Sequence, residues 1–355
     1  YETFMYPGVL MTAPEAARAS MEYRCECLPM ARQNAKLHGF RGVQFPWQSG
    51  NSGAEVTSYY CGAREYHINP AVAYAMGQFA HATGDELFIR EKAWPVLKGV
   101  ARWIESFVVK TDRGYETRHF GSPNERFHDV DNDAQMHLFA SAALREAIWC
   151  AEHLGYDAPR RWQEIRDNLF MPTHPDTGAV TQFEGFDGVG SVGPMFGMFP
   201  LGVSYGAETD AATRKNFMDD LWAYAGMPMS SAYCAVWAAR MGRREDAAGL
   251  LDTGIASRVV DPFGMMVEAA PTPDRPAWLT KRTCFVTAHG GLLTSMVLGF
   301  PGLQLGPGGP KDWRHSEVAL PEGWEGLEIE RLWAQGRPVR LSCRHGEKAE
   351  VKFID

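Results

Sequence analysis

The sequence predicts a mainly α-helical protein whose chain ends in a small β-meander. Apolar residues recur at helical spacing up to about residue 300, and strand-like alternation is confined to the C-terminal end. Long connections rich in glycine, proline and aromatic residues separate the helical segments, at about 39–65, 111–131, 171–209 and 257–286. Because such loops are uncommon in a compact helical domain unless they are functional, we expect a ring of helical hairpins with these loops gathered at one end as a funnel.

The helical segments have recognisable start signals and periodicity. Residues 12–15 (TAPE) are typical of a capping box in which Thr12 caps the helix, Pro14 stands in its first turn and Glu15 completes the box. An alanine-rich helix is expected to follow. The other expected helices lie at about 68–79, at 97–108 behind the cap candidate Asp85, at 134–153, near 157, 210, 230 and 242, and at 290–299.

The last part of the chain has the pattern of antiparallel strands. Polar and apolar residues alternate at 327–332, 339–343 and 350–353, and glycine-containing turns follow Gln335 and His345. We therefore expect a helical domain over residues 1–310 and a C-terminal β-strand domain over residues 311–355.

Composition argues against several classes of protein. The chain has 355 residues, of which 45% are hydrophobic and 22% charged, as in globular rather than disordered proteins. A net charge of -8 without a basic patch argues against a nucleic-acid partner. No stretch approaches the roughly 18 apolar residues of a membrane span, so no membrane partner is expected.

The seven cysteines indicate free thiols. Their number is odd, they form no CxxC pair, and their spacing fits no zinc site. Free thiols favour a cytoplasmic location, while a periplasmic or secreted location stays open because the chain begins at Tyr1 and not at Met. The eleven histidines include no HExxH motif, so no metal site is expected.

Two motifs match well-known sequence patterns but lack the neighbouring strands or helix that those patterns require. Residues 188–193 (GVGSVG) match a dinucleotide-binding fingerprint, but no strand precedes them and Pro194 follows them. Residues 202–206 (GVSYG) match a nucleophile elbow, and His289 lies downstream, but the buried strands of an α/β hydrolase are missing. We expect neither a cofactor loop nor a serine nucleophile.

Two glutamates in the long loops are candidates for acid–base chemistry. Glu125 lies in residues 122–129 (SPNERFHD), where a proline stiffens its approach and a phenylalanine follows. Glu268 stands alone in an apolar run, residues 265–271 (MMVEAAP). A carboxyl group partly shielded from water has a raised pKa and can act as a general acid near neutral pH. For both, the residues alone favour an ordinary solvated or capping role.

Aromatic residues accompany these acids. Trp47 lies among polar neighbours in residues 45–49 (FPWQS), and Phe183 and Phe186 lie in residues 182–186 (QFEGF). Aromatic faces beside amide and carboxyl groups suit a sugar, whose ring has apolar faces and a fringe of hydroxyl groups. Packing between helices is the alternative, and it is a stronger one for the two phenylalanines than for Trp47.

An ordered set of short motifs runs through nearly the whole chain. The motifs are 2–7 (ETFMYP), 42–49 (GVQFPWQS), 65–68 (EYHI), 122–128 (SPNERFH), 182–186 (QFEGF), 285–291 (FVTAHGG) and 299–303 (GFPGL). In their order and spacing they resemble the glycoside hydrolase family that contains maltose and kojibiose phosphorylases, acid trehalases and the glucosidase acting on glucosylgalactosyl-hydroxylysine. Each match is short, and the order makes the resemblance specific.

The resemblance implies an (α/α)6 barrel followed by a small C-terminal β-domain. It implies an inverting exo-acting α-glycosidase that needs no cofactor and whose partner is a carbohydrate, an α-linked disaccharide or glycoside. Glu125 would protonate the departing oxygen, and Glu268 would activate water on the opposite face of the sugar. Phe285 stands where the phosphorylases carry a phosphate-contacting histidine, and a carboxylate at 268 would repel phosphate, so both residues favour hydrolysis.

The resemblance also assigns substrate contacts. The chain departs from the family pattern at 47–48 (WQ), 131–137 (DNDAQMH) and 190–191 (GS), around the subsite that reads the sugar, so glucose is only the default sugar. The residues predicted to bind substrate are Trp47, Gln48, Glu55, His67, Arg126, His128, Asn132 and Glu184.

Three further points stay open. The first motif lacks its leading Trp-Asp, so we expect a first barrel helix and an upstream β-sandwich outside this chain, and we do not expect this segment alone to be fully active. A disaccharide phosphorylase and a sugar-binding protein that has lost catalysis are the two alternative functions. Oligomer formation also stays open.

Overall fold

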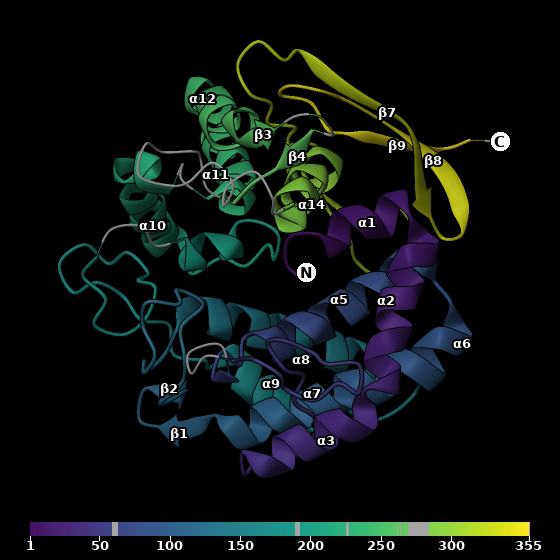
Figure 1. Ribbon diagram of the computed structural model, residues 1–355, viewed down its shortest axis with the longest axis vertical. Helices are drawn as coiled ribbons and strands as arrows, with labels where there is room; N and C mark the ends of the chain where they lie inside the picture. The colour runs from purple at the N-terminus through teal and green to yellow at the C-terminus, as the bar shows by residue number, and fades with distance from the viewer. Residues whose placement is uncertain are drawn as a thin grey trace.

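The inner elements of the fold form a closed ring. The computed structural model describes residues 1–58, 63–188, 192–224, 227–260, 262, 264–268 and 284–354. The inner elements are α1 (Tyr6–Thr12), α5 (Ile68–Thr83), α8 (Ala134–His153), the 3₁₀ helix η2 (Gly193–Gly197), α11 (Pro228–Arg240) and α14 (Val286–Thr294). Followed in one direction around the ring, α11 packs against α14, α14 against α1, α1 against α5, α5 against α8, and α8 against η2 (Figure 1). The ring closes where Phe196 of η2 meets Trp237 of α11, with ring centroids 5.7 Å apart.

Outer helices alternate with the inner elements along the chain and cover the ring. They are α2 (Pro14–Glu26), α3 (Leu28–Leu37), α7 (Trp94–Phe107), α9 (Arg160–Asp167), α10 (Ala207–Asp219) and α12 (Arg244–Gly254). Helix α7 packs on α5 and α8, α9 packs on α8, α10 on η2, and α12 on α11. The remaining helical segments are short: α6 (Glu86–Phe88), the π-helices η1 (Ile89–Ala93) and η5 (Ser295–Gly299), and the 3₁₀ helices η3 (Leu221–Tyr224) and η4 (Ala256–Arg258).

The sequence explains which helices lie inside. Every residue of α5 from Asn69 to Ala82 is buried, whereas α7 buries a single apolar face. A helix that is apolar on all sides must be surrounded by protein, and an amphipathic helix covers its neighbours with one face. Small residues let the inner helices approach closely, since a side chain at Gly77 of α5 would meet Glu146 of α8.

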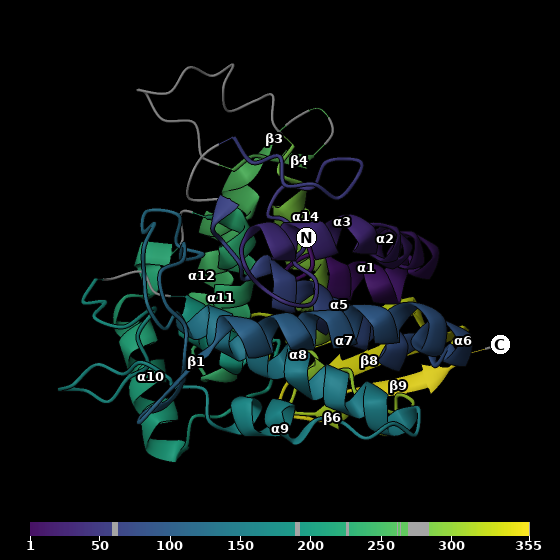
Figure 2. The same ribbon diagram turned by 90° about the horizontal axis from the view of Figure 1, so that it is seen from below.

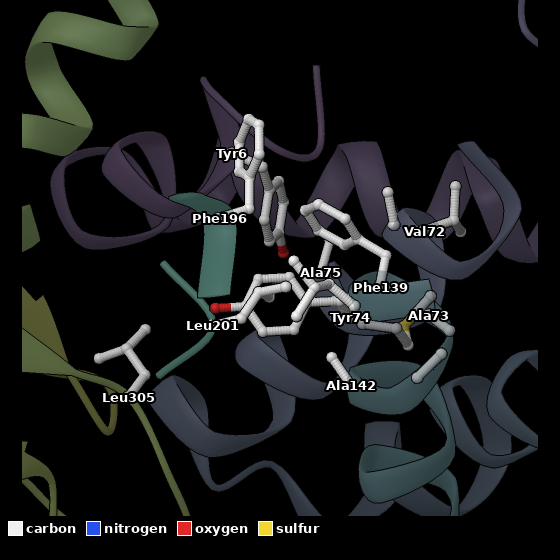
Figure 3. Packing of buried hydrophobic residues seen from close by; sticks show 14 of the residues in the cluster. Tyr6, Val72, Ala73, Tyr74, Ala75, Phe139, Ala142, Phe196, Leu201 and Leu305 are labelled. Carbon is white, nitrogen blue, oxygen red and sulfur yellow. The ribbon is translucent and has the colours of Figure 1, made fainter. Parts of the chain in front are cut away.

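Aromatic side chains fill the middle of the ring. Tyr6, Tyr74, Phe139 and Phe196 come from α1, α5, α8 and η2 and lie together in the core (Figure 3). The ring centroids of Tyr74 and Phe139 are 5.9 Å apart, as are those of Phe139 and Phe196. The toroid is therefore a packed core beneath the loops and not an open pore.

The C-terminal residues form the predicted antiparallel meander. Strand β7 (Gly326–Ala334) pairs with β8 (Arg337–Arg344), which pairs with β9 (Glu350–Phe353). Leu332, Val339 and Leu341 are buried in the same apolar core as the helices. The turn between β7 and β8 is fixed to the barrel because the backbone N–H of Gln335 donates to the carbonyl of Ala82, 2.6 Å away.

The other strands are short hairpins that periodicity does not predict. They are β1 (Val109–Thr111) with β2 (Gly114–Glu116), β3 (Val259–Val260) with β4 (Met265–Met266), and β5 (Leu303–Gln304) with β6 (Arg314–His315).

Two expectations about local structure were wrong. Thr12 does not cap α2, because it is the last residue of α1 and its hydroxyl donates to the carbonyl of Gly8, 2.9 Å away. Ala13 precedes α2 and makes no side-chain cap. The long connection at 171–209 is also not a plain loop, since it contains η2, an element of the inner ring.

The long connections lead into the N-terminal ends of inner elements. They precede α5, α8, η2 and α14. The C-terminal end of α5 instead meets the β-meander, and in Figure 2 strands β8 and β9 lie on the opposite side of the helices from β3 and β4. The ring therefore has a loop end and a sheet end.

Within the described ranges, no helix is both long and apolar enough to span a bilayer. The six cysteines among the described residues are free, and Cys61 lies outside them.

Candidate active site

Backbone hydrogen bonds join the connections at the loop end. The N–H of Gly121 donates to the carbonyl of Arg64, 3.1 Å away, and the N–H of Glu184 donates to that of Asp131, also at 3.1 Å. These bonds link the first predicted loop to the second and the second to the third. Three of the four expected loops are therefore joined to one another, while most of the fourth, at 257–286, lies outside the described residues.

Glu125 lies at the tip of a short closed turn. The N–H of Ser122 donates to the carbonyl of Phe127 at 3.0 Å, and the N–H of Phe127 donates to that of Asn124 at 2.9 Å. The Phe127 ring rests edge-on against Phe183, 4.9 Å between centroids. The turn is thus fixed at its base, while Glu125 at its tip is exposed to solvent.

Asp133 ties this turn to the neighbouring loop. It is fully buried and caps α8, accepting a hydrogen bond from the N–H of Met136 at 3.1 Å. Its other oxygen accepts from the Ser122 hydroxyl at 2.8 Å and from the Gln182 amide at 2.9 Å. Burial raises the pKa of Asp133 to about 6 despite these hydrogen bonds. One carboxylate therefore positions the Glu125 turn and the 182–186 loop together.

Glu125 and Glu268 interact electrostatically. Burial, followed by the charge of Glu268, raises the pKa of Glu125 above that of an ordinary glutamate. Glu268 follows strand β4, where the N–H of Val267 donates to the carbonyl of Arg258 at 3.0 Å. The N–H of Phe285 donates to the carbonyl of Met266 at 2.8 Å, so Phe285 is held beside the segment that carries Glu268.

Glu55 holds the backbone around Trp47. Its carboxylate accepts hydrogen bonds from the N–H groups of Trp47 at 2.8 Å, Gln48 at 3.2 Å and Thr57 at 3.0 Å. Trp47 is half-buried and Gln48 is exposed. The structure thus gives Glu55 a role in shaping the loop, and a direct contact with substrate stays a prediction.

Asn132 and Glu184 belong to a charged network at the other side of the loops. The amide of the buried Asn132 donates to Glu184 at 2.7 Å and to Glu116 at 2.9 Å. Arg113 donates to both carboxylates, and its hydrogen bond is the main reason that the pKa of Glu116 falls to about 2. Asn132 is left-handed, with φ at 52°, a conformation that asparagine tolerates better than most residues.

Three further predicted residues lie on the Glu125 turn or just before α5. Arg126 and His128 are exposed near Glu125. His67 is 9% exposed and precedes α5, with its Nδ1 atom 3.8 Å from Oε2 of Glu65. All the predicted site residues lie at the loop end; their contacts with substrate remain predictions.

The sequence-based interpretation missed Glu65, Asp133 and Glu116 as members of the site. Glu65 stands in a matched motif, residues 65–68, and that match was the available signal. Asp133 has the sequence signature of a helix cap, which says nothing about the two loops that it joins.

Two motifs, at 188–193 and 202–206, match known patterns without the required context. Ser204 and His289, which belong to the nucleophile-elbow match, have structural contacts of their own. The Ser204 hydroxyl donates to Asp210 at 2.6 Å near the start of α10, and His289 lies 3.4 Å from the carbonyl of Gly264. Residues 189–191, with the departure at Gly190-Ser191, lie outside the described residues. Over the part of the chain that is described, no group of three or more His, Cys, Asp or Glu side chains is arranged to hold a metal ion.

A ring of inner helices covered by outer helices, with acids and aromatic residues at its loop end, defines an α/α toroid. A solved glycosidase variant in complex with glucose has this architecture, with a TM-score of 0.58 and 17% identity, covering 81% of this chain and 84% of that chain. The predicted fold class is confirmed.

Residues 1–192 match the family described as glycosyl hydrolase family 65, central catalytic domain. The chain belongs to this family, which is the predicted one. It is 28% identical over 333 residues to a kojibiose hydrolase of Flavobacterium johnsoniae, and this match covers 92% of the chain and 47% of that protein. It is 23% identical over 410 residues to a kojibiose phosphorylase of Halothermothrix orenii, covering 100% of the chain and 51% of that protein. The chain spans about half the length of these relatives.

Proposed function

We propose that the chain is the catalytic barrel of an inverting exo-acting α-glycosidase in which Glu125 is the general acid and Glu268 the general base. The electrostatic interaction between these two carboxyl groups, which come from loops far apart in the sequence, is the observation that carries the proposal.

Glu125 supplies the proton in the proposed mechanism. Its raised pKa keeps the carboxyl group protonated closer to neutral pH, so it can protonate the glycosidic oxygen as the bond breaks. Glu268 removes a proton from water on the opposite face of the sugar, and the water oxygen bonds to the anomeric carbon as the aglycone leaves. Inverting enzymes separate the two carboxyl groups by roughly 6.5–9.5 Å to admit this water.

Two residues favour water over phosphate as the nucleophile. Phe285 is held beside the Glu268 segment, and a phenyl ring offers no hydrogen bond or charge to phosphate. The Glu268 carboxylate repels an anion in the same position. A hydrolase therefore fits this site better than a phosphorylase.

The substrate class is an α-linked disaccharide or a glucosyl-galactose type of glycoside, with glucose as the default sugar. Trp47 offers an aromatic face for a sugar ring, and the hydrogen bonds to Glu55 fix the backbone that carries it.

The Glu125→Gln variant of the full-length protein tests the proposal. We expect hydrolysis of the preferred α-linked disaccharide to fall by roughly 10²–10⁴-fold, because glutamine is similar in shape but cannot donate the catalytic proton. Release of reducing sugar from a panel of disaccharides measures the effect. Glu330→Gln, at an exposed position of β7, is the matched control. Undiminished turnover in Glu125→Gln would refute the proposal.

The same panel separates the two alternatives. A phosphorylase would need inorganic phosphate and would release a sugar 1-phosphate. A sugar-binding protein would bind the disaccharide and release no product; the departures from the family pattern around the sugar subsite are what support this alternative.

A further inference from the structure

Glu65 is a buried carboxyl group that the proposed acid–base pair does not use. The residue is 3% exposed. Its Oε1 atom is buried and has no hydrogen-bond partner among the described residues. A buried polar atom is normally paired, so an unpaired oxygen beside a candidate active site points to a partner that arrives with the substrate.

Glu65 has neighbours in Trp47 and in His67, the residue just before α5. The Trp47 side chain forms a hydrogen bond with its carboxyl group. On the other side, Nδ1 of His67 lies 3.8 Å from Oε2 of Glu65, and this nitrogen is also buried and unpaired among the described residues. Glu65 and His67 therefore each keep one buried hydrogen-bonding atom without a partner among the described residues, and Glu65 is itself bonded to Trp47.

The charges around Glu65 disfavour its ionised form. The charges of Glu125, from the second loop, and of Asp133, at the start of α8, both act on it. His67 is neutral, because burial lowers its pKa to about 3, and the adjacent Arg64 donates to the carbonyl of His119. Burial, with the charge of Glu125 adding to it, raises the pKa of Glu65 to about 8.

We propose that Glu65 is a substrate-positioning residue whose buried, unpaired Oε1 atom meets a hydroxyl group of the sugar on Trp47. This proposal rests on the proposed function, since it requires a sugar in the site. A protonated carboxyl group both donates and accepts hydrogen bonds, as a sugar hydroxyl does. A neutral group at Glu65 also adds no negative charge close to the general acid Glu125.

Kinetics of two substitutions in the full-length protein test the contact. Glu65→Ala removes the hydrogen bond and is expected to raise KM by roughly tenfold with a smaller change in kcat. Glu65→Gln keeps a donor and an acceptor but cannot ionise, so it should retain more of kcat/KM than Glu65→Ala. Wild-type KM should rise as the pH passes about 8, and KM of Glu65→Gln should not. An unchanged KM in Glu65→Ala, or a Glu65→Gln variant as inactive as Glu125→Gln, would overturn the proposal.

Thermal unfolding tests the protonation state of Glu65 and does not require the protein to cleave any substrate. The folded protein keeps Glu65 protonated up to about pH 8, while the unfolded chain ionises it above about pH 4.5. The melting temperature of the wild type should therefore fall relative to that of Glu65→Gln as the pH rises from 4.5 to 8. A pH-independent difference would contradict the proposal whether or not disaccharides are cleaved.

A binding measurement separates failure of this proposal from failure of the proposed function. If no disaccharide is cleaved, glucose should still raise the melting temperature of the wild type more than that of Glu65→Ala. An equal shift in both proteins would exclude a contact between Glu65 and the sugar.

Discussion

Carboxyl groups at the loop end have distinct environments, and these environments suggest distinct roles. Glu125 is exposed on a closed turn, Asp133 is buried and hydrogen-bonded through both oxygens, and Glu65 is buried with an unpaired oxygen. Burial raises the pKa of each of them. Pairs of titratable groups whose surroundings shift their pKa values are typical of acid–base sites.

At the residue scale, the interaction between Glu125 and Glu268 predicts a change in pH dependence. The negative charge of Glu268 favours the protonated form of Glu125, so Glu268→Gln should lower the pKa of Glu125. Because the general acid must be protonated, the alkaline limb of residual kcat/KM should move to lower pH. The pH–rate profile measures this shift; an alkaline limb that stays in place or moves to higher pH would show that the two groups do not interact.

At the scale of elements, the N-terminal end of α8 combines a helix cap with a joint between two loops. Asp133→Ala should destabilise the protein by about 1–3 kcal/mol, because it removes the cap of α8 and the buried hydrogen bond that the Gln182 amide donates to Asp133. It should also lower kcat, because Ser122 loses the contact that fixes the Glu125 turn.

Asp85 provides the matched control for Asp133. It caps α6 by accepting from the N–H of Phe88 at 3.0 Å, away from the loop end. Asp85→Ala should lower the melting temperature and leave kcat unchanged. If the two variants lose kcat equally, the loop-joining role assigned to Asp133 is wrong.

Local sequence signals predicted elements well where one interaction decides the structure. The limits of α8 and the three strands of the meander follow from periodicity and turn residues. The capping box at Thr12 failed because α1 ends immediately before α2, so the hydroxyl bonds backward within α1. The two-residue strands β3 and β4 are too short for any alternation to be visible.

The candidate site was predictable only in part, because some of its contacts join residues that are far apart in the sequence. Trp47 and Glu125 stand in matched motifs, and Glu268 was selected as an isolated acid in a long loop; their roles stay predictions. The contact of Asp133 with Gln182 joins different loops, and that of Glu65 with Trp47 joins distant residues of one long loop. No local pattern encodes such contacts, because they depend on how the ring closes.

At the scale of the whole molecule, the aromatic core supports the loop end by closing the ring. Phe196 is 1% exposed and contacts rings from α8 and α11. Phe196→Ala should destabilise the protein by about 3–5 kcal/mol through lost burial and the cavity left behind. Leu37→Ala, at an 81% exposed position, should stay within about 0.5 kcal/mol of the wild type. Chemical denaturation measures both values, and equal values for the two variants would contradict a core centred on the ring.

The stereochemistry of the product tests the acid–base pair most directly. Proton NMR of the first product that the full-length protein releases from an α-linked disaccharide distinguishes the two anomers before they interconvert. A Glu125–Glu268 pair acting through water predicts the β-anomer, in buffer free of phosphate. Release of the α-anomer, or release only when phosphate is present, would contradict it.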